Sequence, residues 1–257
     1  INGKKGNDVI SINAKYSQVE FNLFESLGLT YITVDDETIR AFHTETLSLI
    51  DKEITLNTSE SNYNFIEDDY TYIDHYWEGT DQDDLLIYKG GNDTINGKKG
   101  NNVLSINAKH SQIDILSFES LGIYRITVDD DDVILSINNE IISYIDGQYS
   151  LKYYNESNYN VVEDAYTYID HYWEGTDQDD LLIYNGGNDV INGKEGNDVI
   201  SINAKYSQID VNLFESLGLN YITVDDETIR AFNTEYLILL DNSYRLNTSK
   251  SNYNFIE

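Results

Sequence analysis

A repeat of nine residues constrains this chain more than any other feature of its sequence. Between Gly79 and Ser105 an aspartate or asparagine recurs every nine residues, and an aliphatic residue follows two positions after each one. The recurring pairs are Asp84 and Leu86, Asp93 and Ile95, and Asn102 and Leu104. Glycines gather in the positions before each pair. The pattern predicts a glycine-rich turn and one short strand in every nonapeptide.

Two such nonapeptides are expected to complete one coil of a parallel β-roll. Residues eighteen apart then stack, so Asp84 and Asn102 would line one edge and Asp93 the other. Carboxylates and turn carbonyls at such an edge can form an oxygen cage, which suits calcium. Aspartate and glycine also form β-turns without any ion. The fixed step of nine favours calcium over that simpler interpretation.

The nonapeptides resemble the repeat of the RTX family, which reads GGxGxDxUx with a large aliphatic residue at U. The resemblance covers about a quarter of the chain. It implies calcium ligands at Asp8, Asp84, Asp93, Asp180, Asp189 and Asp198, with Asn102 in the place of an aspartate once. An amide oxygen carries no charge, so the site at Asn102 should be weaker. Asp81 and Asp177, in GTDQDD, either cap the ion of the first coil or form a solvated acidic turn.

A longer repeat encloses the nonapeptides. The segment that begins at Ile1, INGKKGNDVISINAKYSQ, recurs with few changes at Ile95 and Ile191. The steps are 95 - 1 = 94 and 191 - 95 = 96 residues. We therefore expect three tandem copies: copy 1 over residues 1–78, copy 2 over residues 79–174 and copy 3 over residues 175–257. The two ends interrupt the unit at unrelated points, so we expect a fragment of a longer array.

The rest of each copy has the signals of strands and tight turns. In copy 1, YITV and TIRAF flank Asp35, Asp36 and Glu37, and TLSLI and ITLN flank Asp51 to Glu53. These segments predict two acidic hairpins. The expected fold is all-β, with each copy a short calcium-binding parallel β-roll joined to a hairpin-rich antiparallel module, and the copies in series forming an elongated rod.

The charge of the chain limits its partners. There are 46 acidic and 16 basic residues, for a formal net charge of -30. Nucleic acids and anionic membrane surfaces require lysine or arginine, so neither is an expected partner. No apolar run reaches the roughly 20 residues needed to span a bilayer, so membrane insertion is not expected. Bound calcium ions would offset the repulsion among the carboxylates.

Two aromatic or histidine motifs admit alternatives. Trp77 and Trp173, with the tyrosines around them, could stack on sugars, although packing against the hairpins is the simpler interpretation. His75 and His171 lie beside acidic residues and could indicate zinc or acid–base chemistry. One histidine per copy is too few for a typical tetrahedral zinc site, so a structural role is favoured.

No catalytic motif stands out, and an active site is rarely needed three times per chain, so we do not expect an enzyme. The RTX resemblance implies a secreted or cell-surface bacterial protein, exported by type I secretion and folded by external calcium. We predict a structural repeat from the stalk of an adhesin, a fibre or a surface layer, in which neighbouring copies can associate. The alternatives are a calcium-dependent module that binds surface glycans and the repeat region of an RTX toxin or exoenzyme.

Overall fold

The computed structural model describes residues 1–56, 61–118, 121–151, 159–166, 168–214 and 218–246. The chain forms two compact units, Ile1–Glu156 and Ser157–Glu257, which are described separately. The fold is all-β, and helical structure in the described residues is limited to 3-10 turns such as Tyr16–Gln18. Within these residues no helix has the length and apolar character to cross a membrane.

Copy 2 has two five-stranded sheets, and the roll lies in both of them. The first sheet has the order β16 (Gly147–Ser150), β15 (Ile141–Tyr144), β11 (Val103–Ser105), β9 (Asp84–Ile87) and β7 (Asn64–Glu67). The second has the order β12 (Ile113–Phe118), β13 (Ile123–Val128), β14 (Asp132–Ile137), β10 (Asp93–Asn96) and β8 (Tyr76–Glu78). Val103 pairs in parallel with Leu85, and Thr94 with Tyr76. Both pairs are eighteen residues apart, which confirms the predicted coil of two nonapeptides.

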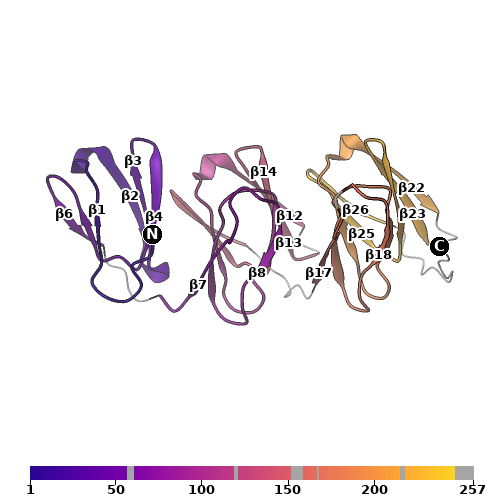
Figure 1. The fold of residues 1–257 in the computed structure, drawn as a ribbon, viewed down its shortest axis with the longest axis horizontal. Coiled ribbons are helices and arrows are strands. Elements are labelled where there is room, and N and C mark those ends of the chain that lie inside the picture. Colours follow the sequence, from indigo (N-terminus) through magenta and orange to yellow (C-terminus); the bar gives the residue numbers. More distant parts are fainter. Residues whose placement is uncertain (57–60, 119–120, 152–158, 167, 215–217, 247–257) are drawn as a thin grey trace. The chain divides into compact units, whose positions relative to one another are not determined.

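The hairpins extend the sheets of the roll instead of forming layers of their own. Strand β15 pairs in parallel with β11, and β14 pairs in parallel with β10. Strands β8, β12, β13 and β14 of the second sheet can be found in Figure 1. The roll strands are only three or four residues long and would otherwise leave open edges. The roll and the hairpins are therefore joined more closely than the sequence suggested. The other edge of each sheet is formed by β7 and β8, which precede Gly79 and the first glycine-rich turn.

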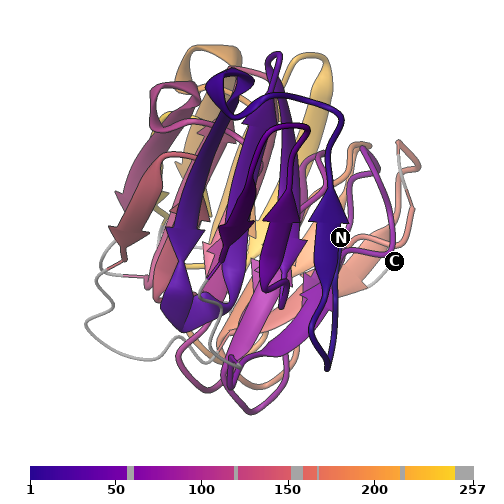
Figure 2. The same ribbon diagram turned by 90° about the vertical axis from the view of Figure 1, so that its left-hand side faces the viewer.

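Copies 1 and 3 repeat this architecture. Copy 1 has one sheet of β1 (Val9–Ser11), β5 (Thr46–Ser48) and β6 (Glu53–Thr55), and another of β2 (Val19–Phe24), β3 (Leu29–Val34) and β4 (Glu37–Phe42) (Figure 2). The turn between β3 and β4 has positive φ at Asp35 and Asp36, as a two-residue type I′ hairpin requires. The two sheets of the second unit begin with β17 (Asn160–Glu163) and β18 (Tyr172–Glu174), which precede copy 3 in the chain. Their other strands, from copy 3 itself, are β19 (Asp180–Ile183), β20 (Val190–Asn192), β21 (Val199–Ser201), β22 (Ile209–Phe214), β23 (Leu219–Val224), β24 (Glu227–Phe232), β25 (Tyr236–Ile238) and β26 (Ser243–Arg245).

The aliphatic residue of each nonapeptide points into the core between the two sheets. Leu86, Ile95 and Leu104 are fully buried in one cluster of copy 2. Leu182, Ile191 and Ile200 occupy the same places in copy 3. Burial of a large aliphatic side chain contributes about 1.5–3 kcal/mol. The two-residue offset from each aspartate therefore places the carboxylate at the turn while the aliphatic residue supports the sheets.

Copies 1 and 2 share a further apolar cluster, which we call the junction. Leu29, Tyr31 and Phe42 of copy 1 pack in it with residues of copy 2 that include Val103 and Ile145. Polar groups also cross the junction, as two groups of hydrogen bonds show. The Tyr31 hydroxyl lies 3.0 Å from Ser105 Oγ and donates to Ser143 O at 3.0 Å. Arg40 donates to Ser105 O at 3.0 Å and to Tyr88 O at 2.9 Å.

Candidate calcium sites

Asp198, in the third nonapeptide of copy 3, has a carboxylate with one unsatisfied oxygen. The residue is fully buried at the start of β21. Its Oδ1 accepts a hydrogen bond from the Asp180 N–H at 2.9 Å, and its own N–H donates to Glu235 Oε2 at 2.7 Å. Its Oδ2 is buried and accepts no hydrogen bond among the described residues. A buried anionic oxygen in this state requires a cation or a proton.

A glycine leaves the space in which this oxygen lies. A Cβ at Gly193 would stand 2.1 Å from Asn233 O and 2.4 Å from Asp198 Oδ2. Both distances are too short for a real contact, so only glycine fits at this position. A carbonyl oxygen and a carboxylate oxygen thus approach the same point. Two acceptors cannot bond each other, whereas both can coordinate a hard cation. The residues present therefore fit calcium, which Asp198, the Asn233 carbonyl and the neighbouring Glu235 would hold.

The electrostatics of copy 3 favour a positive charge beside Asp198. Burial, together with the nearby carboxylates of Glu235, Asp180 and Asp179, raises the pKa of Asp198 to about 8. Without an ion, the carboxyl therefore holds a proton at neutral pH. A divalent cation would reverse this effect, because an adjacent positive charge favours the ionised form.

Copy 1 has the same arrangement at Asp8. The Asp8 N–H donates to Glu45 Oε2 at 2.7 Å, and Asp8 Oδ2 is buried without a hydrogen-bond partner among the described residues. A Cβ at Gly3 would lie 2.3 Å from His43 O and 2.8 Å from Asp8 Oδ2. The same three kinds of oxygen therefore meet in copies 1 and 3.

Copy 2 has the amide of Asn102 where copies 1 and 3 have the carboxylates of Asp8 and Asp198. Asn102 Oδ1 accepts from the Asp84 N–H at 3.0 Å, as Asp198 does from Asp180. Asn102 Nδ2 donates to Asn138 O at 3.0 Å, so the carbonyl that faces a carboxylate in the other copies has a donor here. The site at Asn102 was predicted to be weaker for lack of charge. The structure adds that its amide already satisfies the neighbouring carbonyl without an ion.

Asp84 and Asp180, which open the first coil of copies 2 and 3, are satisfied by protein donors. Asp84 Oδ2 accepts from the Thr80 N–H at 2.6 Å, and its Oδ1 accepts from Thr80 Oγ1 at 3.0 Å. Thr176 gives Asp180 the same two bonds. A Cβ at Gly79 would stand 2.7 Å from Gly97 O and 2.6 Å from Asp84 Oδ2, so a turn carbonyl also approaches this carboxylate.

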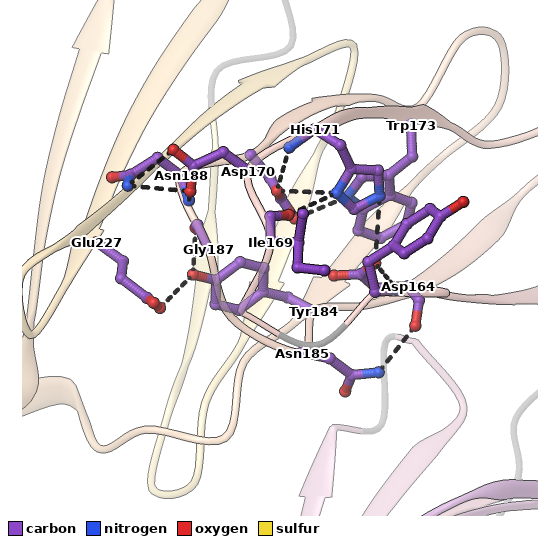
Figure 3. A network of polar contacts seen from close by, with 12 residues as sticks. Asp164, Ile169, Asp170, His171, Trp173, Tyr184, Asn185, Gly187, Asn188 and Glu227 are labelled. Atoms are coloured by element: carbon purple, nitrogen blue, oxygen red, sulfur yellow. Dashed lines mark hydrogen bonds and ion pairs between the residues drawn. The ribbon is translucent and has the colours of Figure 1, made fainter.

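Asp93 and Asp189, on the opposite edge of the roll, contact a histidine and a tryptophan. Figure 3 shows His171 close to Asp164, and its Nε2 lies 3.3 Å from Asp164 Oδ1. The Nδ1 atom of the same ring lies 3.2 Å from Asp189 Oδ1. Trp173 Nε1 donates to Asp189 Oδ2 at 3.0 Å. Asp68, His75 and Trp77, at the end of copy 1, form the same arrangement with Asp93 of copy 2. Burial raises the pKa of Asp93 to about 6.

Asp164, His171 and Asp189 are also close enough together to hold a metal ion. The two carboxylates, however, face different nitrogens of the ring, and Nδ1 lies 2.9 Å from Ile169 O. With protons on both nitrogens, the ring can bridge the two carboxylates by hydrogen bonds. These contacts agree with the structural role favoured for the histidine. Sequence reasoning missed Asp68 and Asp164, although both stand at the same place before YIDHYW.

The remaining predicted ligands lie at the surface. Asp81 and Asp177 are exposed, and Asp81 Oδ2 lies 3.5 Å from Lys99 Nζ. Their role as caps of an ion stays a prediction. Three glutamates that sequence reasoning missed accept from the backbone of the third-nonapeptide residue: Glu45, Glu140 and Glu235. The sequence could have revealed them, because in every copy a glutamate follows the third-nonapeptide aspartate or asparagine by 37 or 38 residues, just before a hairpin strand.

These geometries are those of a β-roll whose turns have the oxygen atoms to hold a cation, and comparison with known families identifies its repeat. Residues 87–105 and 174–201 match the RTX calcium-binding nonapeptide repeat, in four copies. The chain carries RTX repeats, which bind calcium. Asp8 and Asp84 lie outside the matched residues.

Two further comparisons concern whole proteins. No curated protein matches the chain in sequence. Among solved structures, the chain is similar to the extracellular lipase LipA from Serratia marcescens, with 11% identity and a TM-score of 0.29. The match covers 72% of this chain and 41% of the lipase.

Proposed function

We propose that the chain is a calcium-stabilised structural segment of a secreted or cell-surface bacterial RTX-like protein, such as the stalk of an adhesin, a fibre or a surface layer. RTX repeats are typical of proteins exported by type I secretion, and we propose the same route here. The carboxylates would bind calcium outside the cell. The parent protein's load-bearing or spacing role would then depend on that ion.

The buried, unsatisfied oxygens of Asp8 and Asp198 carry this proposal. Each lies at the turn from which a roll strand begins, so an ion bound there holds together a turn carbonyl, a roll strand and a hairpin glutamate. Without calcium, each site must hold a proton or bring like charges together. Because binding is coupled to the folded arrangement, calcium stabilises the fold by mass action.

The junction between copies 1 and 2 supports a mechanical role. It joins two copies through a shared apolar cluster and hydrogen bonds from buried or half-buried side chains. Side chains packed in this way limit bending between neighbouring copies. A stalk or fibre needs such a restriction between its copies.

The test is a calcium titration of the chain, followed by far-UV circular dichroism and hydrodynamic radius, with magnesium and a chelator as controls. We expect a cooperative gain of β signal and a change of radius with calcium only. The double variant Asp8→Asn with Asp198→Asn should lose most of the response, while Asp81→Asn should keep it. An unchanged spectrum and radius in chelator and in calcium would refute the proposal.

A carbohydrate-binding role is the second candidate, and the exposed aromatic residues favour it. Tyr72 and Tyr168 are 75% and 73% exposed at equivalent positions of the two described rolls. Trp77 and Trp173 are half-buried and donate to Asp93 and Asp189, so they are less suited to stack on a sugar. A glycan array in calcium, with Tyr72→Ala and Tyr168→Ala as paired variants, tests this function. Absence of binding by the unaltered chain would exclude it.

A further inference from the structure

The two edges of the roll differ at the residue that lies five positions before each aspartate. At the edge with Asp198, which we call the first edge, Gly193 holds this position and leaves the space in which the carboxylate meets a turn carbonyl. We call the edge with Asp93 and Asp189 the second edge. There the position is held by tyrosines, Tyr88 and Tyr184. A Cβ in this place excludes the close approach of carbonyl and carboxylate that marks the first edge.

The hydroxyl of each tyrosine closes a turn of the second edge. In the second unit, Tyr184 Oη lies 2.7 Å from Gly187 O and 2.8 Å from Glu227 Oε2 (Figure 3). The same contacts recur in the first unit among Tyr88, Gly91 and Asp132. Burial and the adjacent carboxylate raise the pKa of both hydroxyls, so each keeps its proton and can donate. The turn carbonyl therefore has a hydrogen-bond donor where an ion would need its lone pairs.

The buried aspartates of the second edge have donors on both carboxylate oxygens. Asp189 Oδ2 accepts from Trp173 Nε1 at 3.0 Å, and its Oδ1 accepts from the His171 backbone N–H at 3.1 Å. The same two bonds recur in the first unit among Asp93, Trp77 and His75. The indole and the backbone N–H donate whatever the charge of the imidazole. Asp198 Oδ2, at the first edge, accepts no hydrogen bond among the described residues.

One further carboxylate at the second edge keeps an oxygen without a donor. Asp68 Oδ2 and Asp164 Oδ2 are buried and accept no hydrogen bond among the described residues. Calcium takes six to eight oxygens, so a single carboxylate oxygen does not make a site. The neighbouring oxygens, on Asp189 and Gly187 in the second unit, already accept from N–H or O–H groups. The second edge therefore lacks the open oxygens that calcium requires.

From these contacts we infer that hydrogen bonds replace calcium along the second edge, so any calcium that the two described rolls bind lies along the first edge. The RTX resemblance implied Asp93 and Asp189 as ligands, but the residues around them do not fit an ion. The inference rests on the proposed calcium role only for the contrast between the edges. Removal of calcium should then release the first edge, while protein donors keep the second edge closed.

Titration calorimetry with calcium counts the ions per chain and tests the inference. The variant Asp93→Asn with Asp189→Asn should keep the count of the unaltered chain. The matched control, Asp8→Asn with Asp198→Asn, makes the same change at the first edge and should lose the ions of those two turns. The readout is the count, because a less stable fold lowers apparent affinity without removing a site. A lower count in the second-edge variant, with circular dichroism showing a folded chain in calcium, would overturn the inference.

A milder variant decides the question if those substitutions unfold the chain. Tyr88→Phe with Tyr184→Phe keeps both rings and removes only the hydroxyls that donate at the second edge. Urea unfolding in calcium should show a folding equilibrium constant lowered about tenfold, because buried hydrogen bonds are lost, and the calcium count should not change. Tyr16→Phe with Tyr206→Phe removes hydroxyls from two exposed tyrosines and should change that constant by less than about threefold. An unchanged constant in the first pair would mean that an ion satisfies the turn carbonyls, which contradicts the inference.

A transition metal is the other occupant that the test must exclude, because Asp164, His171 and Asp189 are close enough together to hold one. Zinc titration of the unaltered chain is compared with that of His75→Gln with His171→Gln. Equal zinc binding by both chains supports the inference. Zinc that binds the unaltered chain and is lost from the variant would overturn it.

The two proposals can fail separately. A chain that binds no calcium refutes the proposed function, whereas urea unfolding of Tyr88→Phe with Tyr184→Phe in chelator still tests the second edge. A chain that binds calcium at both edges refutes the second-edge inference alone.

Discussion

Replacing Asp198 with asparagine should stabilise the calcium-free protein and remove one calcium site. Copy 2 already contains this chemistry, since Asn102 donates to Asn138 O at 3.0 Å where copy 3 has a carboxylate near Asn233 O. The variant would exchange a buried carboxyl that must take up a proton in the calcium-free fold for a neutral amide that donates to the facing carbonyl. Its shape is almost unchanged, so the effect on stability should come from the charge and the hydrogen bond.

The pKa of Asp198 sets the magnitude. In the calcium-free fold it is raised from 3.8 to about 8, so the contribution of this carboxyl to folding is fully present below pH 3.8 and is lost progressively as the pH rises from 3.8 toward 8. At about 1.4 kcal/mol per pKa unit, the loss at pH 7 is about 4 kcal/mol. Solvent screening around the half-buried Glu235 and Asp179 reduces it to about 2 kcal/mol. Asp198→Asn should recover this amount at pH 7 and less at pH 5.

Urea unfolding in chelator and in calcium measures the effect, because urea leaves the electrostatics unscreened. In a Trp77→Phe background, Trp173 is the one remaining tryptophan, and its fluorescence reports the sheet in which β18 pairs with β20 of copy 3. The reciprocal change Asn102→Asp should destabilise the calcium-free form and add one bound calcium in titration calorimetry. Asp81→Asn, at the surface, should change stability by less than about 0.5 kcal/mol. A lower stability of Asp198→Asn in chelator, or an unchanged calcium count, would refute the reasoning.

Three further predictions test the sites separately. Calcium affinity should rise between pH 6 and pH 8, with proton release seen as a buffer-dependent binding enthalpy, because calcium displaces the proton of Asp198; affinity independent of pH would contradict this. Gly193→Ala should lower calcium affinity and the urea midpoint in calcium, because a Cβ would stand 2.1 Å from Asn233 O; unchanged values would show that the turn can relax. Trp173→Phe keeps an aromatic ring but removes the donor to Asp189, so it should cost about 1–3 kcal/mol in urea unfolding followed by circular dichroism, and no loss would mean that water replaces the indole.

The roll and its core follow from local sequence. The step of nine and the offset of two place Leu86 and Ile95 between the sheets, and the acidic pair Asp35 and Asp36 forms the expected hairpin turn. These features depend on residues close together in the chain, where side-chain periodicity and turn preference act directly. The all-β class and the eighteen-residue coil were predictable for that reason.

The completed sites depend on residues far apart in the chain. Glu235 contacts Asp198, which lies 37 residues before it in the chain. The Asn233 carbonyl approaches the Asp198 carboxylate because of the path of the backbone, which the pattern of side chains does not predict. The placement of His171 between two carboxylates likewise follows from pairing of strands eighteen residues apart. The role of Tyr31 and Arg40 could not be predicted from copy 1 alone, because both side chains donate hydrogen bonds to backbone carbonyls of copy 2.

The strands that precede Gly79 have a consequence for how such an array can change in length. Strands β7 and β8 precede the glycine-rich turns in the sequence but pair with β9 and β10, which follow Gly79. The folded unit therefore begins earlier in the chain than the sequence repeat that starts at Gly79. Recombination between the near-identical segments at Ile1 and Ile191 would delete or add whole periods. Each resulting roll would still receive its first two strands from the segment before it, so the number of repeats can vary without breaking a sheet.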